Sequence, residues 1–245
     1  IEEFEKVITS KTKAIIICSP NNPTGYLYSK EEMYKLRDLC LKHDLYLFSD
    51  EAYREFCYDG DYVSALHIEG LEQHVVLMDT ISKRYSACGA RLGALVTKNK
   101  AVYDAAMKFA QARLSPPGLA QIMGEAAIDL PESYFEAPKA EYLSRRNLLV
   151  KRLNAMPGVV CPNPGGAFYA MAKLPIDDSD TFCQWLLESF AHNGQTVMLA
   201  PATGFYGTTG LGKQEVRLAY VLNTEALDAA MDCLEAALKV YPGRL

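Results

Sequence analysis

The stretch Lys13–Gly25, KAIIICSPNNPTG, decides the fold that this sequence predicts. Its first half is a short, nearly continuous apolar run, which is typical of a strand buried on both faces. Proline and glycine then mark a turn. Ser29 is placed to cap a helix from Lys30, where Glu31 and Glu32 favour the first turn. Strand, turn and capped helix in this order predict the start of a parallel α/β sheet.

The same alternation continues along the chain. Strands are predicted at 45–49 (LYLFS, continued by DEAYREF), at 74–78 (HVVLM) and at 93–97 (GALVT). A helix is predicted from about Asn99 to Gln111. Strands that alternate with helices indicate a mostly parallel sheet in a three-layer α/β fold.

The organisation changes after residue 112. A break at SPPGL is followed by two helical stretches that run to about Asn154 and are interrupted near Pro131. The remainder predicts strands at AFYAMAKL, QTVMLAP and EVRLAYV, and helices at SDTFCQWLLESFAHNG and NTEALDAAMDCLEAALKVY. We therefore predict a large α/β part (1–112), a helical connector (113–154) and a small α+β domain (155–245).

Composition excludes several classes of function. The net charge is -5 and no basic block occurs, so nothing indicates a nucleic-acid partner. No apolar run approaches the roughly 20 residues of a membrane span. The seven cysteines are scattered singly without metal-ligand spacing, which is typical of reduced thiols in a cytoplasmic protein and predicts no metal site.

Polar residues follow three consecutive predicted strands. They are Asn22 after the first, Asp50 and Tyr53 after the second, and Thr80, Ser82 and Lys83 after the third. Ligands bind at the carboxyl ends of parallel strands, because the loops there converge. Singly, a lysine in a turn or an aspartate after a strand is ordinary; together they favour a ligand site.

Each residue type suits one part of a ligand that has an aldehyde, a pyridine ring and a phosphate. The Lys83 amine can form an imine with an aldehyde, and Asp50 can keep a pyridine nitrogen protonated. Tyr53 and Asn22 can hydrogen-bond a phenolate oxygen on that ring. Arg91, with the Thr80 and Ser82 hydroxyls, can bind a phosphate, and Gly89 and Gly93 allow close approach of the backbone.

These motifs carry a family resemblance. SPNNPTG, SDEAY and SKRYSACGARLG stand in the order and spacing of the class I/II aminotransferases, fold type I enzymes that use pyridoxal 5′-phosphate (PLP). VRLAYV, with Arg217, resembles the family's site for the substrate α-carboxylate. The resemblance covers nearly the whole chain, and it implies that residues 1–112 are the C-terminal part of a PLP-binding large domain.

The resemblance implies a role for each site residue. Lys83 would be the Schiff-base lysine and proton shuttle, and Asp50 would pair with the pyridine nitrogen. Tyr53 and Asn22 would contact the ring's 3′-oxygen, with Asn22 also near the substrate. Thr80, Ser82 and Arg91 would bind the phosphate. Arg217 would form a bidentate pair with the substrate carboxylate, a geometry that lysine replaces poorly. Phe168 and Tyr169 are placed near the site.

The chain departs from the family pattern in two respects. Thr80 stands where the family usually has serine or glycine, but the hydroxyl is retained. Family members are roughly half again as long, so a further N-terminal portion is expected before Ile1. We therefore expect the chain by itself to bind PLP weakly and to transaminate poorly. The family also implies a homodimer.

The substrate and the reaction stay open at this stage. The C-terminal region resembles aspartate-aminotransferase-like members, which implies aspartate or a similar L-amino acid with a 2-oxo acid. Arg113 is either a second cation for the substrate's side-chain carboxylate or a helix-end arginine that satisfies carbonyls. The alternatives are a PLP-dependent β-lyase or decarboxylase, and a non-catalytic aminotransferase-like domain of a transcriptional regulator.

Overall fold

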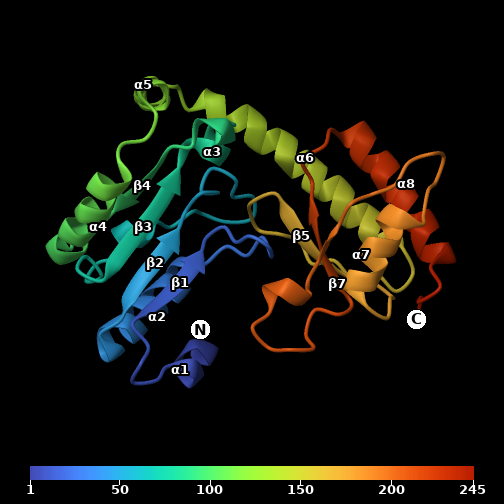
Figure 1. Cartoon of the computed structure of the whole chain (residues 1–245), viewed down its shortest axis with the longest axis horizontal. Helices are drawn as coiled ribbons and strands as arrows, with labels where there is room; N and C mark the ends of the chain where they lie inside the picture. Colours follow the sequence, from blue (N-terminus) through green and yellow to red (C-terminus); the bar gives the residue numbers. More distant parts are fainter. The chain divides into compact units, whose positions relative to one another are not determined.

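A four-stranded sheet forms the centre of the first of two units in the computed structural model, which describes residues 1–245 (Figure 1). The strands stand in the order β1 (Ala14–Cys18), β2 (Tyr46–Asp50), β3 (Val75–Thr80) and β4 (Gly93–Val96). β1, β2 and β3 are parallel, and β4 pairs antiparallel with β3. The α/β class and the mostly parallel sheet are confirmed.

The helices up to Ala155 are α1 (Glu2–Val7), α2 (Lys30–His43), the single turn α3 (Ile81–Arg84), α4 (Lys100–Arg113), α5 (Gly118–Ile128) and α6 (Ser133–Ala155). Two helices lie between the strands of this sheet, α2 between β1 and β2 and α3 between β3 and β4; the others precede or follow the sheet in the chain. Short 3-10 turns lie at Ala65–His67 and Cys88–Ala90. No helix of the structure has both the length and the apolar character needed to cross a membrane. All seven cysteines are free thiols.

The start of α2 confirms the predicted cap. The Ser29 hydroxyl accepts a hydrogen bond of 3.2 Å from the Glu32 backbone N–H, and Glu32 Oε2 accepts one of 2.8 Å from the Ser29 backbone N–H. This reciprocal arrangement satisfies two backbone donors that the first helical turn leaves without intrahelical partners. The helix therefore begins at Lys30, as expected.

One face of the sheet packs on α2. Leu36 of α2 is fully buried in a cluster with Ile15, Ile17 and Leu47 from the first two strands. Ile16 lies between two of these residues and is 72% exposed. The prediction that this strand is buried on both faces is therefore wrong. Alternate side chains of a strand point to opposite faces, and at β1 only the face of Ile15 and Ile17 is covered.

The predicted strands AFYAMAKL and EVRLAYV lose residues at their ends, and two other predictions fail over most of a segment. β2 ends at Asp50, so DEAYREF does not continue it; Asp50 Oδ1 accepts from the Ala52 N–H, which turns the backbone out of the sheet. In QTVMLAP only Ala200–Pro201 (β6) pairs with a neighbouring strand. Both segments have strand-like composition, but a strand also needs a partner for its backbone groups.

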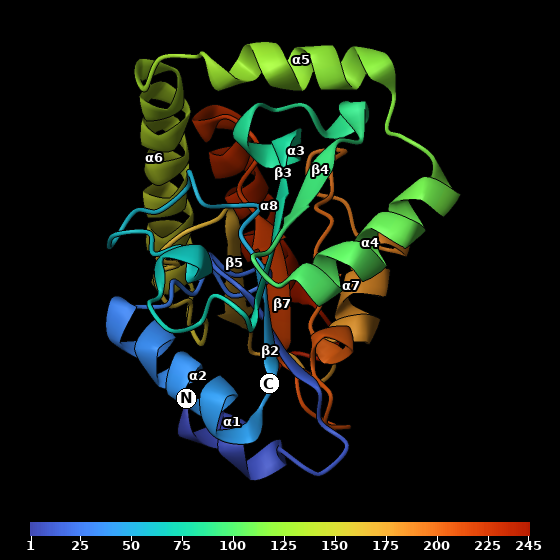
Figure 2. The same ribbon diagram turned by 90° about the vertical axis from the view of Figure 1, so that its left-hand side faces the viewer.

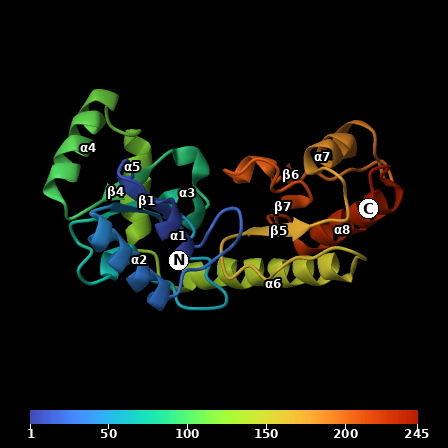
Figure 3. The same ribbon diagram turned by 90° about the horizontal axis from the view of Figure 1, so that it is seen from below.

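The second unit is built on a three-stranded antiparallel sheet. Its order is β5 (Tyr169–Lys173), β7 (Glu215–Ala219) and β6. In Figure 3, α6 and α8 (Thr224–Val240) lie on one side of this sheet and α7 (Ser179–Glu188) on the other. Asp178 caps α7 and Asn223 caps α8. A 3-10 turn at Thr203–Phe205 follows β6. This is the predicted set of α and β elements.

The division into units follows contacts rather than chain order. The first unit comprises Ile1–Asn21 and Tyr26–Glu136, and the second Asn22–Gly25 and Ala137–Leu245. The division after Glu136 falls inside the predicted connector 113–154.

The short segment Asn22–Gly25 belongs to the second unit because it is bonded there. Gly166 donates a 3.0 Å backbone hydrogen bond to the Gly25 carbonyl. Gly25 has a φ of +71°, and a Cβ at this position would stand 2.3 Å from Cβ of Pro164. Only glycine allows this approach.

Candidate active site

The turn that carries Lys83 is held at its start by Thr80. In Figure 2, α3 stands at the end of β3. Thr80 is the N-cap of α3, and its Oγ1 accepts a 3.1 Å hydrogen bond from the Ser82 N–H. The same oxygen lies 2.8 Å from Ser82 Oγ and 3.0 Å from the carbonyl of Leu92, which precedes β4. The hydroxyls of Thr80 and Ser82, both predicted site residues, are therefore together beside Lys83.

Two more predicted site residues, Asp50 and Tyr53, lie at the end of β2 in the first unit. Asp50 is the last residue of β2 and is half-buried, and the Tyr53 side chain is buried three positions further on. Nζ of Lys83 lies 5.9 Å from the centre of the Tyr53 ring. An ammonium at this distance from a ring face is attracted by the ring quadrupole. Lys83 and Tyr53, from different loops, are thus neighbours.

Arg91 occupies an exposed bend between α3 and β4. Its backbone is left-handed, with a φ of 55°, and its Nη1 donates a 2.9 Å hydrogen bond to the Cys88 carbonyl. Gly93 follows where β4 meets β3, and a Cβ there would stand 2.8 Å from the Asp79 carbonyl oxygen. The predicted close approach at this glycine is therefore between two strands of the protein.

Glu51, between Asp50 and Tyr53, is a buried carboxylate that sequence reasoning missed. Oε1 accepts from Ser49 Oγ at 3.0 Å and the Ala65 N–H at 2.9 Å; Oε2 accepts from Ser64 Oγ at 2.9 Å and from the Tyr62 hydroxyl. Burial raises the pKa of the Glu51 carboxyl above its ordinary value, and these hydrogen bonds oppose the rise. The carboxylate fixes the loop that begins at Asp50.

A cluster of four charged residues behind α3 was also missed. Arg84 follows Lys83 and pairs with both oxygens of Asp79 and with Glu55, while Arg54 pairs with the same two carboxylates. The sequence offered one signal for this cluster, the cation that directly follows the site lysine. The partners could not be identified without the fold.

In the second unit, Arg217 and Asn22 lie together. Arg217 Nη1 donates a 3.0 Å hydrogen bond to Asn22 Oδ1. The guanidinium carbon lies 4.8 Å from the centre of the Tyr169 ring and 5.1 Å from that of Phe205. Two rings and an amide thus fix the direction of the guanidinium. Tyr169 was expected near the site, Phe168 is buried against Tyr169, and Phe205 was missed.

Arg113 makes no contact with the other predicted site residues. It is the last residue of α4, it is exposed, and its guanidinium makes neither a hydrogen bond nor an ion pair. Leu114, which follows, has a φ of 72° and is also exposed.

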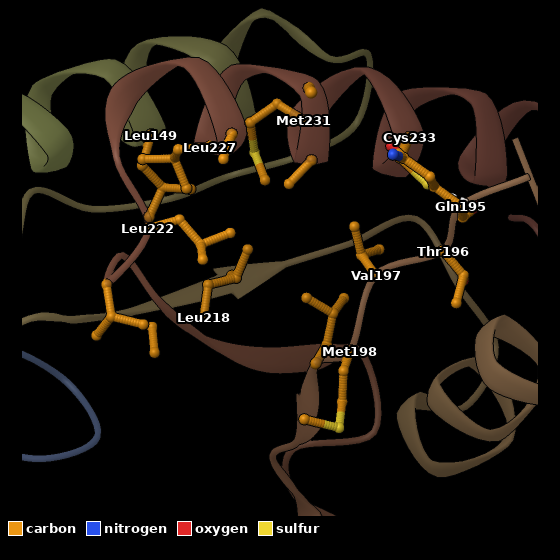
Figure 4. Close-up of a pocket in the computed structure, with 16 residues that line it drawn as sticks. Leu149, Gln195, Thr196, Val197, Met198, Leu218, Leu222, Leu227, Met231 and Cys233 are labelled. Carbon is orange, nitrogen blue, oxygen red and sulfur yellow. Dashed lines mark hydrogen bonds between the residues drawn. The ribbon is translucent and has the colours of Figure 1, made fainter. Parts of the chain in front are cut away.

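The second unit also contains an apolar cavity of about 730 Å³, shown in Figure 4. Leu149, Leu218, Leu227 and Met231 contribute to its wall, and none of its lining residues is charged. Leu218 and Arg217 are adjacent on β7, so their side chains point to opposite faces of the strand. This cavity offers no charged partner for a phosphate or a carboxylate.

Comparison with known proteins identifies the family of this chain. The sequence pattern of the family described as "Aminotransferase class I and II" matches residues 1–234. The chain belongs to this aminotransferase family. The predicted resemblance is confirmed.

Individual aminotransferases match over nearly the whole chain. The aspartate aminotransferase of Bacillus subtilis is 31% identical over 240 residues, which cover 94% of this chain and 58% of the relative. Aromatic-amino-acid aminotransferase 2 of Thermococcus litoralis is 34% identical, over 98% of this chain and 60% of the relative. The structure of Thermus thermophilus aspartate aminotransferase with maleate aligns with a TM-score of 0.86 at 30% identity, over 97% of this chain and 60% of that one. The chain therefore spans about three fifths of the length of these aminotransferases.

Proposed function

We propose that this chain supplies the cofactor lysine and the substrate-binding arginine of a PLP-dependent aminotransferase, which transfers the amino group of aspartate or a similar L-amino acid to a 2-oxo acid. The observation that carries the proposal is the position of Lys83 beside Tyr53, at the carboxyl ends of two parallel strands. Membership of the aminotransferase family supports the same reaction.

The donor set of the first unit fits PLP. Asp50 is a carboxylate for the pyridine nitrogen, and Tyr53 carries a hydroxyl for the ring's 3′-oxygen. Thr80, Ser82 and Arg91 offer hydroxyls and a guanidinium for the phosphate. When bound, PLP supplies an aldehyde carbon and a ring that withdraws electrons.

The part of Lys83 in this reaction is to bind the cofactor and to move a proton. Its amine would be the covalent attachment point of PLP. Once the substrate's amino group has displaced it, Nζ would take the proton from the substrate's α-carbon and deliver it to C4′ of the cofactor. The cap on α3 by Thr80 supports this role, because a proton carrier has to be held within reach of both atoms.

Arg217 and Asn22 would bind the substrate. The planar guanidinium of Arg217 matches a carboxylate with two parallel hydrogen bonds, and the rings of Tyr169 and Phe205 hold it in one orientation. Asn22 Oδ1 accepts from Nη1, which leaves Nη2 and Nε for the two parallel hydrogen bonds to the α-carboxylate.

The attachment of PLP to Lys83 can be tested directly. The chain is incubated with PLP, reduced with borohydride and digested, and mass spectrometry locates the labelled lysine. We expect the label at Lys83 and its loss in Lys83→Ala. Lys100→Ala is the matched control, because Lys100 is exposed and paired only with Asp104. Label spread evenly over the lysines of the unaltered chain would contradict the proposal.

The choice of aspartate is supported by the relatives, several of which are aspartate aminotransferases, and by maleate, a dicarboxylate, in the Thermus structure. Arg113 is the proposed second cation for the side-chain carboxylate. We expect Arg113→Ala to reduce amino transfer from aspartate more than from alanine. Equal losses with both donors would exclude Arg113 from substrate selection.

A β-lyase or decarboxylase remains the second candidate, because Arg217 would hold the α-carboxylate in an elimination as well. Product analysis separates the reactions. Amino transfer yields one 2-oxo acid for each amino acid formed and releases neither ammonia nor carbon dioxide. Release of ammonia in an amount equal to the substrate consumed would indicate elimination, and release of carbon dioxide in that amount would indicate decarboxylation.

The proposed assembly is a cytoplasmic homodimer. The dimer is supported by large apolar side chains that are exposed on α4 and α5, since exposed apolar patches mark interaction surfaces. These side chains include Tyr103, Met107, Phe109, Leu119, Ile122 and Met123. Sedimentation of the chain and of an Ile122→Lys variant tests this. A monomer at all concentrations for both would exclude the dimer.

A further inference from the structure

Four charged side chains connect the loop after β2, which carries Arg54 and Glu55, to Asp79 of β3 and Arg84 of α3. Nη2 of Arg84 lies 3.0 and 2.8 Å from the two carboxylate oxygens of Asp79, and its Nε lies 3.4 Å from Oε1 of Glu55. Arg54 lies 3.2 Å from Asp79 and 3.5 Å from Glu55. Each cation thus contacts both anions, and the cluster carries no net charge.

One pair of the cluster is largely shielded from solvent, while the side chains of Arg54 and Glu55 are partly exposed. The side chains of Arg84 and Asp79 are only 12% and 19% exposed. Isolated surface ion pairs contribute little, but here one nitrogen of Arg84, Nη2, lies between the two oxygens of Asp79 while Nε faces Glu55, so a single guanidinium joins two carboxylates in a network. The cluster can therefore fix the direction of the segments to which it is attached.

Those segments carry the proposed cofactor residues. Arg54 directly follows Tyr53 on the loop that leaves β2, and Arg84 directly follows Lys83 on α3. Successive side chains on a helix point about 100° apart, so Arg84 and Lys83 leave α3 in different directions. The cluster consequently links Arg84, at the end of α3, to the loop that carries Tyr53.

The turn needs such a link because it is short. α3 has four residues, and a single helical turn is not stable without tertiary contacts. Thr80 holds its beginning, and the Arg84–Asp79 pair holds its end. No residue of α3 is fully buried, so packing alone does not fix it.

We propose that Arg84, held by Asp79 and Glu55, is a positioning residue that sets the direction of Lys83 toward PLP. The proposal rests on the proposed function, since it assumes that Lys83 is the lysine that binds PLP. Because positive and negative groups in the cluster are equal in number, it orients the turn without adding net charge beside the Lys83 amine.

The test measures how strongly PLP prefers Lys83 to another lysine of the same chain. The lysine amine adds to the aldehyde with loss of water, and hydride from borohydride reduces the resulting C=N bond, which leaves a stable label. Peptide mass spectrometry gives the ratio of label at Lys83 to label at the exposed Lys100. A change in this ratio reports a change in the position of Lys83, whereas a general loss of protein stability would change the labelling of both lysines.

We expect Arg84→Gln to lower the ratio by roughly tenfold to a hundredfold, the range that a displacement of about 1 Å produces in an oriented reaction. Asp79→Asn should lower it similarly, and the double variant should be no worse than either, since the two residues act as one unit. Arg84→Lys keeps the charge but loses the guanidinium that contacts Asp79 through Nη2 and Glu55 through Nε. Its ratio should lie between those of Arg84→Gln and the unaltered chain.

A second readout needs no cofactor. In Arg84→Gln the backbone amides of residues 81–86 should exchange hydrogen faster, while those of α2 keep their rates. Arg152→Gln is the matched control, because Arg152 in the second unit also pairs with two carboxylates, Asp228 and Asp232. It should change neither the ratio nor the exchange of residues 81–86.

The outcomes separate the two proposals. No preference for Lys83 in the unaltered chain would overturn the proposed function, and the positioning role with it. A preference that Arg84→Gln leaves intact, with unchanged exchange at residues 81–86, would overturn the positioning role alone. If Arg84→Gln does not fold, Arg84→Lys decides by the same two measurements.

Discussion

Nη1 of Arg217 donates a 3.0 Å hydrogen bond to Oδ1 of Asn22, although 195 positions separate the two residues in the sequence. Both lie in the second unit, because the segment Asn22–Gly25 leaves the first sheet and packs beside Pro164 and Gly166. The residue after the first predicted strand is therefore bonded to the arginine of the last strand. Any substrate held by Arg217 would meet an arginine whose orientation is already fixed.

Arg217→Lys should raise the KM for the amino donor by about tenfold to a hundredfold, since a hydrogen bond to a charged group contributes about 1.5–3 kcal/mol. Lysine cannot form the second parallel hydrogen bond. The amino-transfer assay gives KM and kcat for the variant. Arg145→Lys is the control, because Arg145 also contacts a ring, that of Tyr142, outside the proposed site. An unchanged KM would remove Arg217 from the substrate site.

Glu51 should make the protein less stable as the pH rises. Its pKa is raised by burial above the ordinary value of 4.5, so the folded state binds more protons than the unfolded state between those two pKa values. The free energy of unfolding therefore decreases as the pH rises through this window, and the loss is complete above the folded pKa.

Urea unfolding at a series of pH values measures this contribution. Glu51→Gln keeps the size of the side chain and removes its titration, so the slope due to Glu51 should vanish in the variant. A difference between the two proteins that does not change with pH would show that the Glu51 carboxyl titrates in the folded state as it does in the unfolded chain.

Ser29→Ala should destabilise the first unit by about 1 kcal/mol, the usual contribution of a serine N-cap. The change removes the hydroxyl that accepts from the Glu32 N–H at the start of α2. Urea unfolding of the variant gives the difference. Ser10→Ala serves as the control, since Ser10 is exposed and makes no side-chain hydrogen bond. Equal stability of both variants would mean that the cap contributes nothing.

Leu36→Ala should cost about 2–5 kcal/mol, because Leu36 is fully buried between α2 and the sheet and its removal leaves a cavity. Leu41 lies on the same helix and is 46% exposed. Leu41→Ala should therefore stay within about 0.5 kcal/mol of the unaltered chain. Thermal and urea unfolding of both variants distinguish a core position from a surface one. Similar losses would contradict the packing of α2 described here.

The sequence predicted the elements well where the signal is local. Ser29 and the apolar run before Asn22 are close to the elements that they define, so spacing and capping chemistry are sufficient to place α2 and β1. The segments DEAYREF and QTVMLAP were misjudged, because strand composition says nothing about whether a partner strand is present. The exposed side chain of Ile16 shows the same limit for burial.

The sequence by itself determined the order of strands and helices, the residue types at the strand ends and the family that they resemble. These follow from periodicity, turn chemistry and motif spacing, which act over a few residues. Only the tertiary structure decided the pairing of Arg217 with Asn22, the four donors of Glu51 and the link from Arg84 to Glu55. Such contacts depend on which loops the folded sheets bring close together. A local sequence pattern contains no information on the distance in space between residues that are far apart in the chain.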